Sequence, residues 1–317
     1  MKLINEILEA ERRIRPFIHH TALLQSKPLT AMIAGKVFLK LENEQHTGSF
    51  KARGSLNKLL SLSDKELQQG MVTASTGNHA QGFARACEIA KANGTIFLPK
   101  TASASKVDAL KYYDVNLEFY GDDSLTTEVH AKQYAADQHK VWVSPYDDLQ
   151  VIAGQGTIGI ELLQDLDHID QVFITVGGGG LISGVASYLK HHKPDIKIIA
   201  CQPKNSPEMA LSVEAGHIVN LEESVPTLSD GSAGGIEHGA MTFPICQSVI
   251  DEFVLIEEQQ IIEAIKLIAH KHHKIIEGAA GVAVAGLIAK RKVSAGRTSV
   301  VIICGGNIDL EKFKTIT

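Results

Sequence analysis

Short apolar runs rich in β-branched residues alternate with longer segments of helical period along most of the chain. Strands that alternate with helices form βαβ crossovers, which connect parallel strands. A first group of strands is predicted at 71–75, 95–100, 116–121 and 140–144. A second group follows a predicted helix at 151–166 and is predicted at 171–176, 196–202 and 297–304. The pattern therefore predicts an α/β protein with two open parallel-sheet lobes rather than one oversized sheet.

One segment interrupts this alternation. Residues 216–242 show little periodicity and combine several glycines with many polar residues. We expect a long loop here, and loops of that length are often functional. Two helices, the last strand and a short tail are expected after it.

The composition limits the class of partner. Of 317 residues, 44% are hydrophobic and 21% are charged, which is enough apolar material for a large core or two lobes. The formal net charge of -5 provides no basic surface for a phosphate backbone, so we expect a small-molecule partner and no nucleic acid. The four cysteines are widely spaced, which favours a reducing, cytoplasmic compartment. The charged N-terminal segment and the lack of an apolar stretch of about 18 residues predict neither export nor a membrane span.

Four consecutive glycines close one predicted strand and open a helix: Gly177, Gly178, Gly179 and Gly180. Glycine lets backbone N–H groups approach an anion closely, and a helix N-terminus adds unpaired N–H groups with favourable polarity. We therefore expect a phosphate site. The segment lacks the lysine of a P-loop and the spacing of a dinucleotide-binding motif.

A second strand-to-helix corner carries Ser75, Thr76 and Asn78, whose polar groups predict a nest for a carboxylate. Lys51 follows the strand-like run 37–42 and stands where a helix would begin. The positive end of a helix dipole and partial burial both disfavour a charged amine, so the pKa of Lys51 should lie below the usual value of about 10.4. A neutral amine at this corner is suited to forming a Schiff base.

Five segments resemble, in order, the motifs of the fold-type II pyridoxal-phosphate enzymes, in particular the serine/threonine dehydratase and serine racemase branch. They are GSFKARG at 48–54, STGNHAQG at 75–82, VIAGQGT at 151–157, VGGGGLISG at 176–184 and CGGNID at 304–309. The resemblance spans nearly the whole chain. It implies two lobes of the tryptophan synthase β type, with pyridoxal 5′-phosphate in the cleft between them.

The resemblance also implies a domain division and an assembly. A large cofactor-binding domain would comprise residues 1–68 and 140–317, and a small substrate-closing domain residues 69–139. A homodimer is the family expectation. The chain ends soon after the last predicted strand, so we expect no C-terminal regulatory domain.

Each matching residue acquires an implied role. Lys51 would hold the cofactor as a Schiff base and then serve as the base that removes the substrate α-proton. The remaining implied cofactor contacts are Phe50 beside the ring, Asn78 at the ring hydroxyl, Gly177–Gly180 at the phosphate, Cys304 at the pyridine nitrogen and Glu277 near the ring. The substrate carboxylate would be received by Ser75, Thr76 and His79.

These roles imply a reaction. A neutral thiol at Cys304 cannot keep the ring nitrogen protonated, so loss of a β-substituent is favoured over transamination. We expect β-elimination of a 3-hydroxy amino acid, L-threonine or L-serine, to a 2-oxo acid and ammonia. Racemases have SSGNH where this chain has STGNH, so Thr76 stands at the position of the second catalytic base. Because threonine is bulkier and stiffer than serine, we expect racemisation to be impaired.

Several alternatives stay open from the sequence. Residues 227–243 resemble dehydratases linked to hydroxyectoine breakdown, so a hydroxyectoine-derived acid or 3-hydroxyaspartate is an alternative substrate. Serine racemisation and β-replacement with a thiol are alternative reactions. A non-enzymatic carrier or sensor of the cofactor is the alternative class.

No metal is expected. Racemase relatives hold a divalent cation with a glutamate and an aspartate six residues apart, and here these places are Gln202 and Glu208, which removes one ligand charge. His270 and His273 share a helical face but have no third ligand at suitable spacing, so we expect a solvated helix end.

Overall fold

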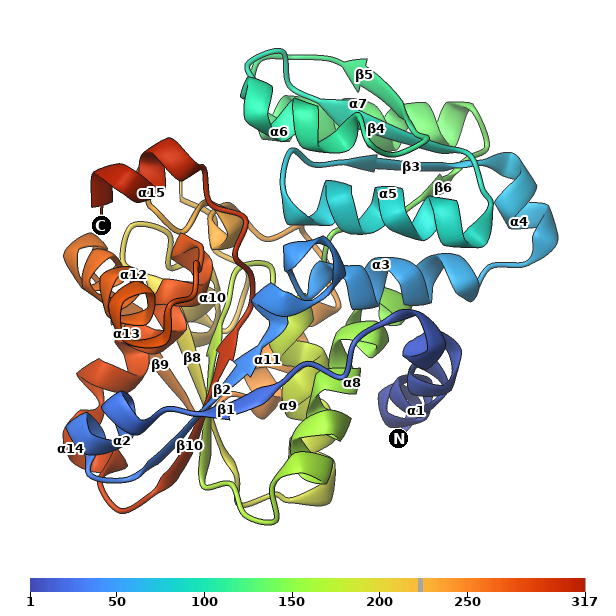
Figure 1. The fold of residues 1–317 in the computed structure, drawn as a ribbon. Helices are drawn as coiled ribbons and strands as arrows, with labels where there is room; N and C mark the ends of the chain where they lie inside the picture. The colour runs from blue at the N-terminus through green and yellow to red at the C-terminus, as the bar shows by residue number, and fades with distance from the viewer. Residues whose placement is uncertain (222–224, 317) are drawn as a thin grey trace.

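The computed structural model describes residues 1–221 and 225–316, which form two sheets with helices packed against them (Figure 1). The larger sheet has the strand order β1-β2-β10-β7-β8-β9. Its strands are β1 (Leu23–Gln25), β2 (Lys36–Leu41), β7 (Gln171–Thr175), β8 (Lys197–Pro203), β9 (Glu252–Ile256) and β10 (Thr298–Ile303). Neighbouring strands run parallel except β1, which pairs with β2 in the antiparallel sense.

The smaller sheet is parallel throughout and has the order β5-β4-β3-β6. Its strands are β3 (Met71–Ala74), β4 (Gly94–Leu98), β5 (Asn116–Phe119) and β6 (Val141–Trp142). Every residue of β3 and β4 is buried, as expected for strands that helices cover on both faces. The predicted α/β class with two parallel-sheet lobes is confirmed.

The helices enclose both sheets. In the larger lobe, α13 packs on β7, β8, β9 and β10, while α9 contacts β7 and packs against α8, which in turn contacts α1 (Figure 1). The helices up to α8 are α1 (Lys2–Ile14), α2 (Lys27–Ile33), α3 (Lys51–Leu60), α4 (Asp64–Gln69), α5 (Asn78–Ala90), α6 (Ala104–Leu110), α7 (Ser124–Asp137) and α8 (Leu149–Asp165). The later helices are α9 (Gly180–His192), α10 (Glu208–Ala215), α11 (Thr242–Val249), α12 (Glu258–His272), α13 (Gly278–Ala289), α14 (Arg291–Ser294) and α15 (Leu310–Ile316).

Some elements go beyond the sequence prediction. The edge strands β1 and β9 are not predicted, because β1 has only three residues and β9 lies in a stretch for which the pattern predicts helices. The same stretch contains α11, α12, α13 and α14, which is two helices more than predicted, and the expected tail forms α15. The first half of the predicted loop at 216–242 includes residues 222–224, which lie outside the described part. In its described part, a 3-10 turn spans Asp230–Ser232, and α11 begins at its last residue.

Strand β6 and helix α3 lie where the two lobes meet. Strand β6 completes the smaller sheet although it follows residue 139, where the predicted small domain ends. Leu56 and Leu59 of α3 also belong to the apolar cluster that includes Met71 and Phe83 of the smaller lobe. The α3 helix therefore packs against the smaller lobe.

The four cysteines, Cys87, Cys201, Cys246 and Cys304, are all free and buried. No helix in the described ranges is long and apolar enough to cross a membrane.

Candidate active site

Lys51 is the first residue of α3, as predicted. Its Nζ donates a hydrogen bond of 2.6 Å to the carbonyl oxygen of Pro145. Desolvation by the surrounding protein lowers the pKa of Lys51 to about 8, although the neighbouring acidic groups of Cys304 and Glu277 act in the opposite direction. The predicted depression of this pKa is thus confirmed, and burial is its main cause.

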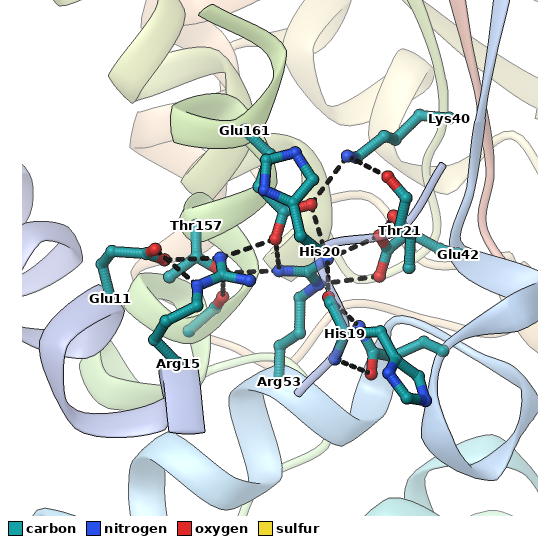
Figure 2. Close-up of polar contacts among 12 residues, drawn as sticks. Glu11, Arg15, His19, His20, Thr21, Lys40, Glu42, Arg53, Thr157 and Glu161 are labelled. Atoms are coloured by element: carbon teal, nitrogen blue, oxygen red, sulfur yellow. Dashed lines mark hydrogen bonds and ion pairs between the residues drawn. The ribbon is translucent and has the colours of Figure 1, made fainter. Parts of the chain in front are cut away.

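A buried group of charged side chains anchors the start of α3. Arg53 donates hydrogen bonds of between 2.7 and 2.9 Å to the carboxylates of Glu42 and Glu161. Lys40 adds an ion pair of 2.7 Å with Glu161. All four side chains are fully buried. Figure 2 shows the Arg53 guanidinium between the two carboxylates. We call these four residues the buried ion cluster.

The buried ion cluster pairs two cations with two anions. Burial alone would lower the pKa of Arg53, but Glu42 and Glu161 outweigh that effect and raise it. Burial would likewise raise the pKa of Glu161, but Arg53 and Lys40 hold it low. Because a guanidinium offers several N–H groups in a fixed plane, Arg53 ties α3 to α8 and to the 3-10 turn Glu42–Glu44 that follows β2, with a defined orientation.

Phe50 and Cys304 lie beside Lys51. The Phe50 N–H donates a hydrogen bond of 3.0 Å to the Cys304 carbonyl oxygen, which joins the start of α3 to the end of β10. The Lys51 Nζ lies 5.2 Å from the centre of the Phe50 ring. Burial raises the pKa of the Cys304 thiol well above its usual value, and the nearby Glu277 raises it further, so the thiol is neutral.

The glycine loop Gly177–Gly180 connects β7 to α9 and is closely covered. A Cβ at Gly178 would lie 2.5 Å from the ring of Tyr146, and one at Gly177 would lie 2.8 Å from the backbone of Ser232. Gly179 has a φ of +89°, which side chains rarely adopt. No residue with a side chain fits these positions without displacing its neighbours. The first N–H groups of α9 have no carbonyl partner within their own helix, which makes them suited to binding an anion.

Asn78 links the smaller lobe to the larger one. Its Nδ2 donates to both carboxylate oxygens of Glu277, at 2.8 and 2.9 Å, and its Oδ1 accepts from Asn307 Nδ2 at 2.7 Å. Burial raises the pKa of Glu277 to about 7. A Cβ at Gly305 would lie 2.5 Å from Glu277 Oε1, so a side chain there would displace the Glu277 carboxylate. The two residues Asn78 and Glu277, predicted from distant segments, are thus in direct contact.

Ser75 and Thr76 form the loop between β3 and α5. The Ser75 hydroxyl accepts from the Gly77 N–H at 3.2 Å. The first N–H groups of α5 follow at Asn78 and His79, and such groups have no carbonyl partner within their own helix. The loop therefore presents hydroxyl and N–H groups of the kind that bind a carboxylate.

The His79 ring turns away from this loop. Its nitrogens lie 3.3 Å from the Ser55 hydroxyl and 3.0 Å from the Thr73 hydroxyl. Burial and then the charge of Lys51 lower the pKa of His79 to about 3. The ring is neutral and engaged within the smaller lobe, so only the His79 backbone N–H is oriented by the helix towards an anion.

No role was predicted from the sequence for three neighbours of this site, although Asn307 lies in the matching segment CGGNID at 304–309. Pro145 and Tyr146 follow β6 and contact Lys51 and the glycine loop, and Asn307 contacts Asn78. For Pro145 and Tyr146, the only available signal was their position just after a predicted strand, because binding residues are often found on loops that a rigid scaffold positions.

Gln202 and Glu208, which stand at the positions of the racemase cation ligands, form hydrogen bonds within the protein. Gln202 Oε1 accepts from the Ala210 N–H at 2.8 Å, and the Ser206 hydroxyl donates to Glu208 at 2.6 Å. Within the described ranges, no group of three or more histidine, cysteine, aspartate or glutamate residues is arranged to hold a metal ion.

Comparisons with known proteins agree with this arrangement. Residues 14–305 match the family model described as pyridoxal-phosphate dependent enzyme. The chain belongs to this family. The L-threonine dehydratase catabolic TdcB of Escherichia coli (strain K12) is 37% identical over 316 residues, which cover 99% of this chain and 95% of the relative.

Solved structures of the family share the fold. Threonine deaminase isoform 2 from Solanum lycopersicum has a TM-score of 0.95 and 34% identity, covering 100% of this chain and 92% of that one. Maize serine racemase has a TM-score of 0.93 and 32% identity, covering 98% of this chain and 95% of that one.

The residues present fit the family's cofactor, pyridoxal 5′-phosphate. A lysine with a lowered pKa offers the amine for a Schiff base, and a glycine loop at the start of a 13-residue helix offers the N–H groups for a phosphate. The neutral Cys304 thiol and the Asn78 amide complete a donor set suited to the ring.

Proposed function

We propose that this protein removes the β-hydroxyl of a 3-hydroxy amino acid, L-threonine or L-serine, to give a 2-oxo acid and ammonia. The observation that carries the proposal is the depressed pKa of Lys51, about 8, at a corner next to a glycine loop and a carboxylate-binding loop. The names of the relatives, L-threonine dehydratase and threonine deaminase, support the choice of substrate.

When bound, pyridoxal phosphate would supply a conjugated ring that withdraws electrons from the substrate α-carbon. We assign Lys51 to hold this group and to remove the α-proton, because its Nζ is neutral often enough to accept one. We assign Gly177–Gly180 to the phosphate and Ser75 and Thr76 to the substrate carboxylate.

The ring contacts complete the assignment. Asn78, held by Glu277 and Asn307, would donate to the ring hydroxyl in exchange for one of its two bonds to Glu277. Phe50 would pack beside the ring, and the neutral Cys304 thiol would leave the ring nitrogen unprotonated. This combination favours elimination over reactions that need a strongly charged ring.

The proposal is tested with purified holoenzyme, L-threonine and L-serine, with both the 2-oxo acid and ammonia measured. Lys51→Ala should lower kcat by at least about a thousandfold, because general base catalysis alone contributes about 10²–10⁴. Lys65→Ala, an exposed lysine on α4, is the matched control and should keep full activity. Release of no 2-oxo acid from either amino acid would contradict the proposal.

Serine racemisation is the second candidate, because a structural neighbour with that name is 32% identical. Thr76 stands on the carboxylate loop and would have to supply the base for the opposite ring face. Chiral chromatography of the same reactions should show little D-serine in the wild type. Thr76→Ser should increase D-serine if the threonine side chain is what limits inversion.

We also propose three features of the whole protein: a small domain and an assembly that the family resemblance implies, and a compartment that the wide spacing of the cysteines favours. The small domain comprises residues 69–139 together with β6, the protein is a homodimer, and it resides in the cytoplasm. Light scattering on the purified protein tests the dimer, and cell fractionation tests the compartment.

A further inference from the structure

Ser49 joins the 3-10 turn His46–Gly48 to the start of α3 and is fully buried. Its Oγ atom has no hydrogen-bond partner within the described residues. Buried hydroxyl groups usually have a partner, because an unpaired one loses its hydration without compensation. An unpaired hydroxyl two residues before Lys51 therefore indicates a partner outside the polypeptide.

The backbone pairing of Ser49 gives the direction of its side chain. Ser49 forms an isolated antiparallel bridge with Gly305. The hydrogen bonds of 3.0 and 2.9 Å on either side of this bridge join the flanking residues, so Ser49 and Gly305 form the closely spaced, non-hydrogen-bonded type of pair. Side chains of such a pair stand on the same face, with Cβ atoms about 4.5–5.5 Å apart. The Ser49 side chain thus faces the way that a side chain at Gly305 would face.

That face carries the contact between Asn78 and Glu277. A Cβ at Gly305 would lie 2.5 Å from Glu277 Oε1 and 3.1 Å from Asn78 Nδ2. Both carboxylate oxygens of Glu277 accept hydrogen bonds from Asn78, and neither is a partner of the Ser49 hydroxyl. The Ser49 hydroxyl is therefore a further donor on the same face as the Asn78 amide, to which we assign the cofactor ring hydroxyl.

The turn before Ser49 is held in an unusual conformation. Thr47 has a φ of +62°, which a β-branched residue rarely adopts, and Gly48 follows with a φ of +70°. Asn307 Nδ2 lies 2.7 Å from both the Thr47 carbonyl oxygen and Asn78 Oδ1, and it donates to each. Backbone strain of this kind persists where the surroundings fix it, and it collects at ligand sites. One side chain, Asn307, thus positions both the turn that carries Ser49 and the Asn78 amide.

We propose that the Ser49 hydroxyl binds the ring hydroxyl of pyridoxal 5′-phosphate, as a second donor beside Asn78. A hydroxyl oxygen has two lone pairs and accepts from two donors. When that oxygen is ionised, both hydrogen bonds are charge-assisted and therefore stronger. The inference rests on the proposed function only through the place assigned to Asn78, and it does not depend on which amino acid the enzyme converts.

The test removes each partner of this hydrogen bond in turn. Equilibrium dialysis measures the affinity of the wild type and of Ser49→Ala for pyridoxal 5′-phosphate and for 3-deoxypyridoxal 5′-phosphate, which lacks the ring hydroxyl. Ser49→Ala should bind pyridoxal phosphate at least about fivefold more weakly, as expected for the loss of one hydrogen bond. Its affinity for the deoxy analogue should stay within about twofold of the wild-type value, because that hydrogen bond is already missing.

Ser61→Ala is the matched control. Ser61 stands at the far end of α3, and its hydroxyl donates to the Lys58 carbonyl oxygen at 2.7 Å. This variant makes the same chemical change and should bind both cofactors within about twofold of the wild type. Equal losses for both cofactors in Ser49→Ala, or a loss in Ser61→Ala as large as in Ser49→Ala, would overturn the proposal.

Stability separates this role from a structural one. In urea unfolding of the cofactor-free protein, Ser49→Ala should be no less stable than the wild type, because no hydrogen bond within the protein is lost. A clear loss of stability together with equal losses of affinity for both cofactors would make Ser49 a structural residue and refute the proposal.

Asn78→Ala is measured with the same two cofactors. It should also lose affinity chiefly for pyridoxal phosphate, because Asn78 and Ser49 would share one oxygen. Such a dependence in Asn78→Ala but not in Ser49→Ala would leave the ring hydroxyl to Asn78 alone and refute the proposal. All of these measurements are made without substrate. Failure to convert any 3-hydroxy amino acid would therefore contradict the proposed function without changing these results.

Discussion

The Lys51 amine illustrates how burial prepares a residue for chemistry. With a pKa of about 8, roughly one amine in ten is neutral at pH 7. For an ordinary lysine with a pKa of about 10.4, the neutral fraction at pH 7 is about one in 2,500. The protein thus gains more than a hundredfold, roughly, in reactive amine simply by removing water from the side chain.

This shift predicts the pH dependence of cofactor attachment. Neutral Lys51 is the reactive form, so the rate at which cofactor-free protein takes up pyridoxal phosphate should rise with pH and level off above a midpoint near 8. Stopped-flow absorbance between pH 6 and 10 measures it, and butylamine treated in the same way corrects for ionisation of the cofactor. A midpoint near that of butylamine, about 10.4 or above, would show that the amine is fully solvated.

At the residue scale, the sequence predicted where site residues lie in helices better than it predicted which way their side chains point. Lys51 was expected at a helix start and Asn78 at another, and the helix signals are local. The direction of the His79 ring depends on Ser55 and Thr73, which reach it only in the folded smaller lobe. The contact of Tyr146 with Gly178 likewise joins two segments that no local pattern relates.

At the scale of elements, the glycine loop between β7 and α9 is the most constrained connection of the site. Gly178→Ala would bring a Cβ to within 2.5 Å of the Tyr146 ring. Overpacking of this kind costs about 1–3 kcal/mol, which corresponds to a loss of about five- to 150-fold in cofactor affinity. Equilibrium dialysis against pyridoxal phosphate measures the loss.

The double variant Gly178→Ala/Tyr146→Ala serves as the control for this mechanism. Removing the ring makes room for the new methyl group, so part of the affinity should return if the clash is the cause. If the losses of cofactor affinity in the two single variants simply add in the double variant, the defect lies instead in the backbone of the glycine loop.

Strands that are buried along their whole length were easier to predict, because burial requires a continuous apolar sequence. Strands β3, β4, β7 and β10 are buried along their whole length, and their continuous apolar runs were recognised. The edge strand β9 is exposed at Leu255 and half-buried at two other positions, so it carries no such run. Its pairing with β8 arises from the tertiary fold, which a local pattern does not contain.

At the scale of the whole molecule, the buried ion cluster predicts where stability is concentrated. Arg53→Met would leave Glu42 and Glu161 without their main partner, and breaking a buried pair in this way costs about 3–5 kcal/mol. Urea unfolding of the cofactor-free protein measures the change in the free energy of unfolding.

Arg12→Met supplies the comparison for that experiment. Arg12 pairs with Glu9 on the surface of α1, where their side chains are 73% and 53% exposed. Exposed pairs contribute about 0–1 kcal/mol, so this variant should unfold almost as the wild type does. Equal destabilisation by both variants would mean that the buried ion cluster contributes no more to the free energy of unfolding than an exposed ion pair does.

The burial of all four thiols gives the molecule reporters in different places. Cys87 lies in the core of the smaller lobe, whereas Cys201, Cys246 and Cys304 lie in the core of the larger lobe, Cys304 at its edge beside Lys51. The rates at which an alkylating reagent modifies these thiols therefore report on the opening of three different regions in one experiment. Modification of Cys304 alone marks separation of the lobes, and modification of Cys87 before Cys201 marks melting of the smaller lobe first.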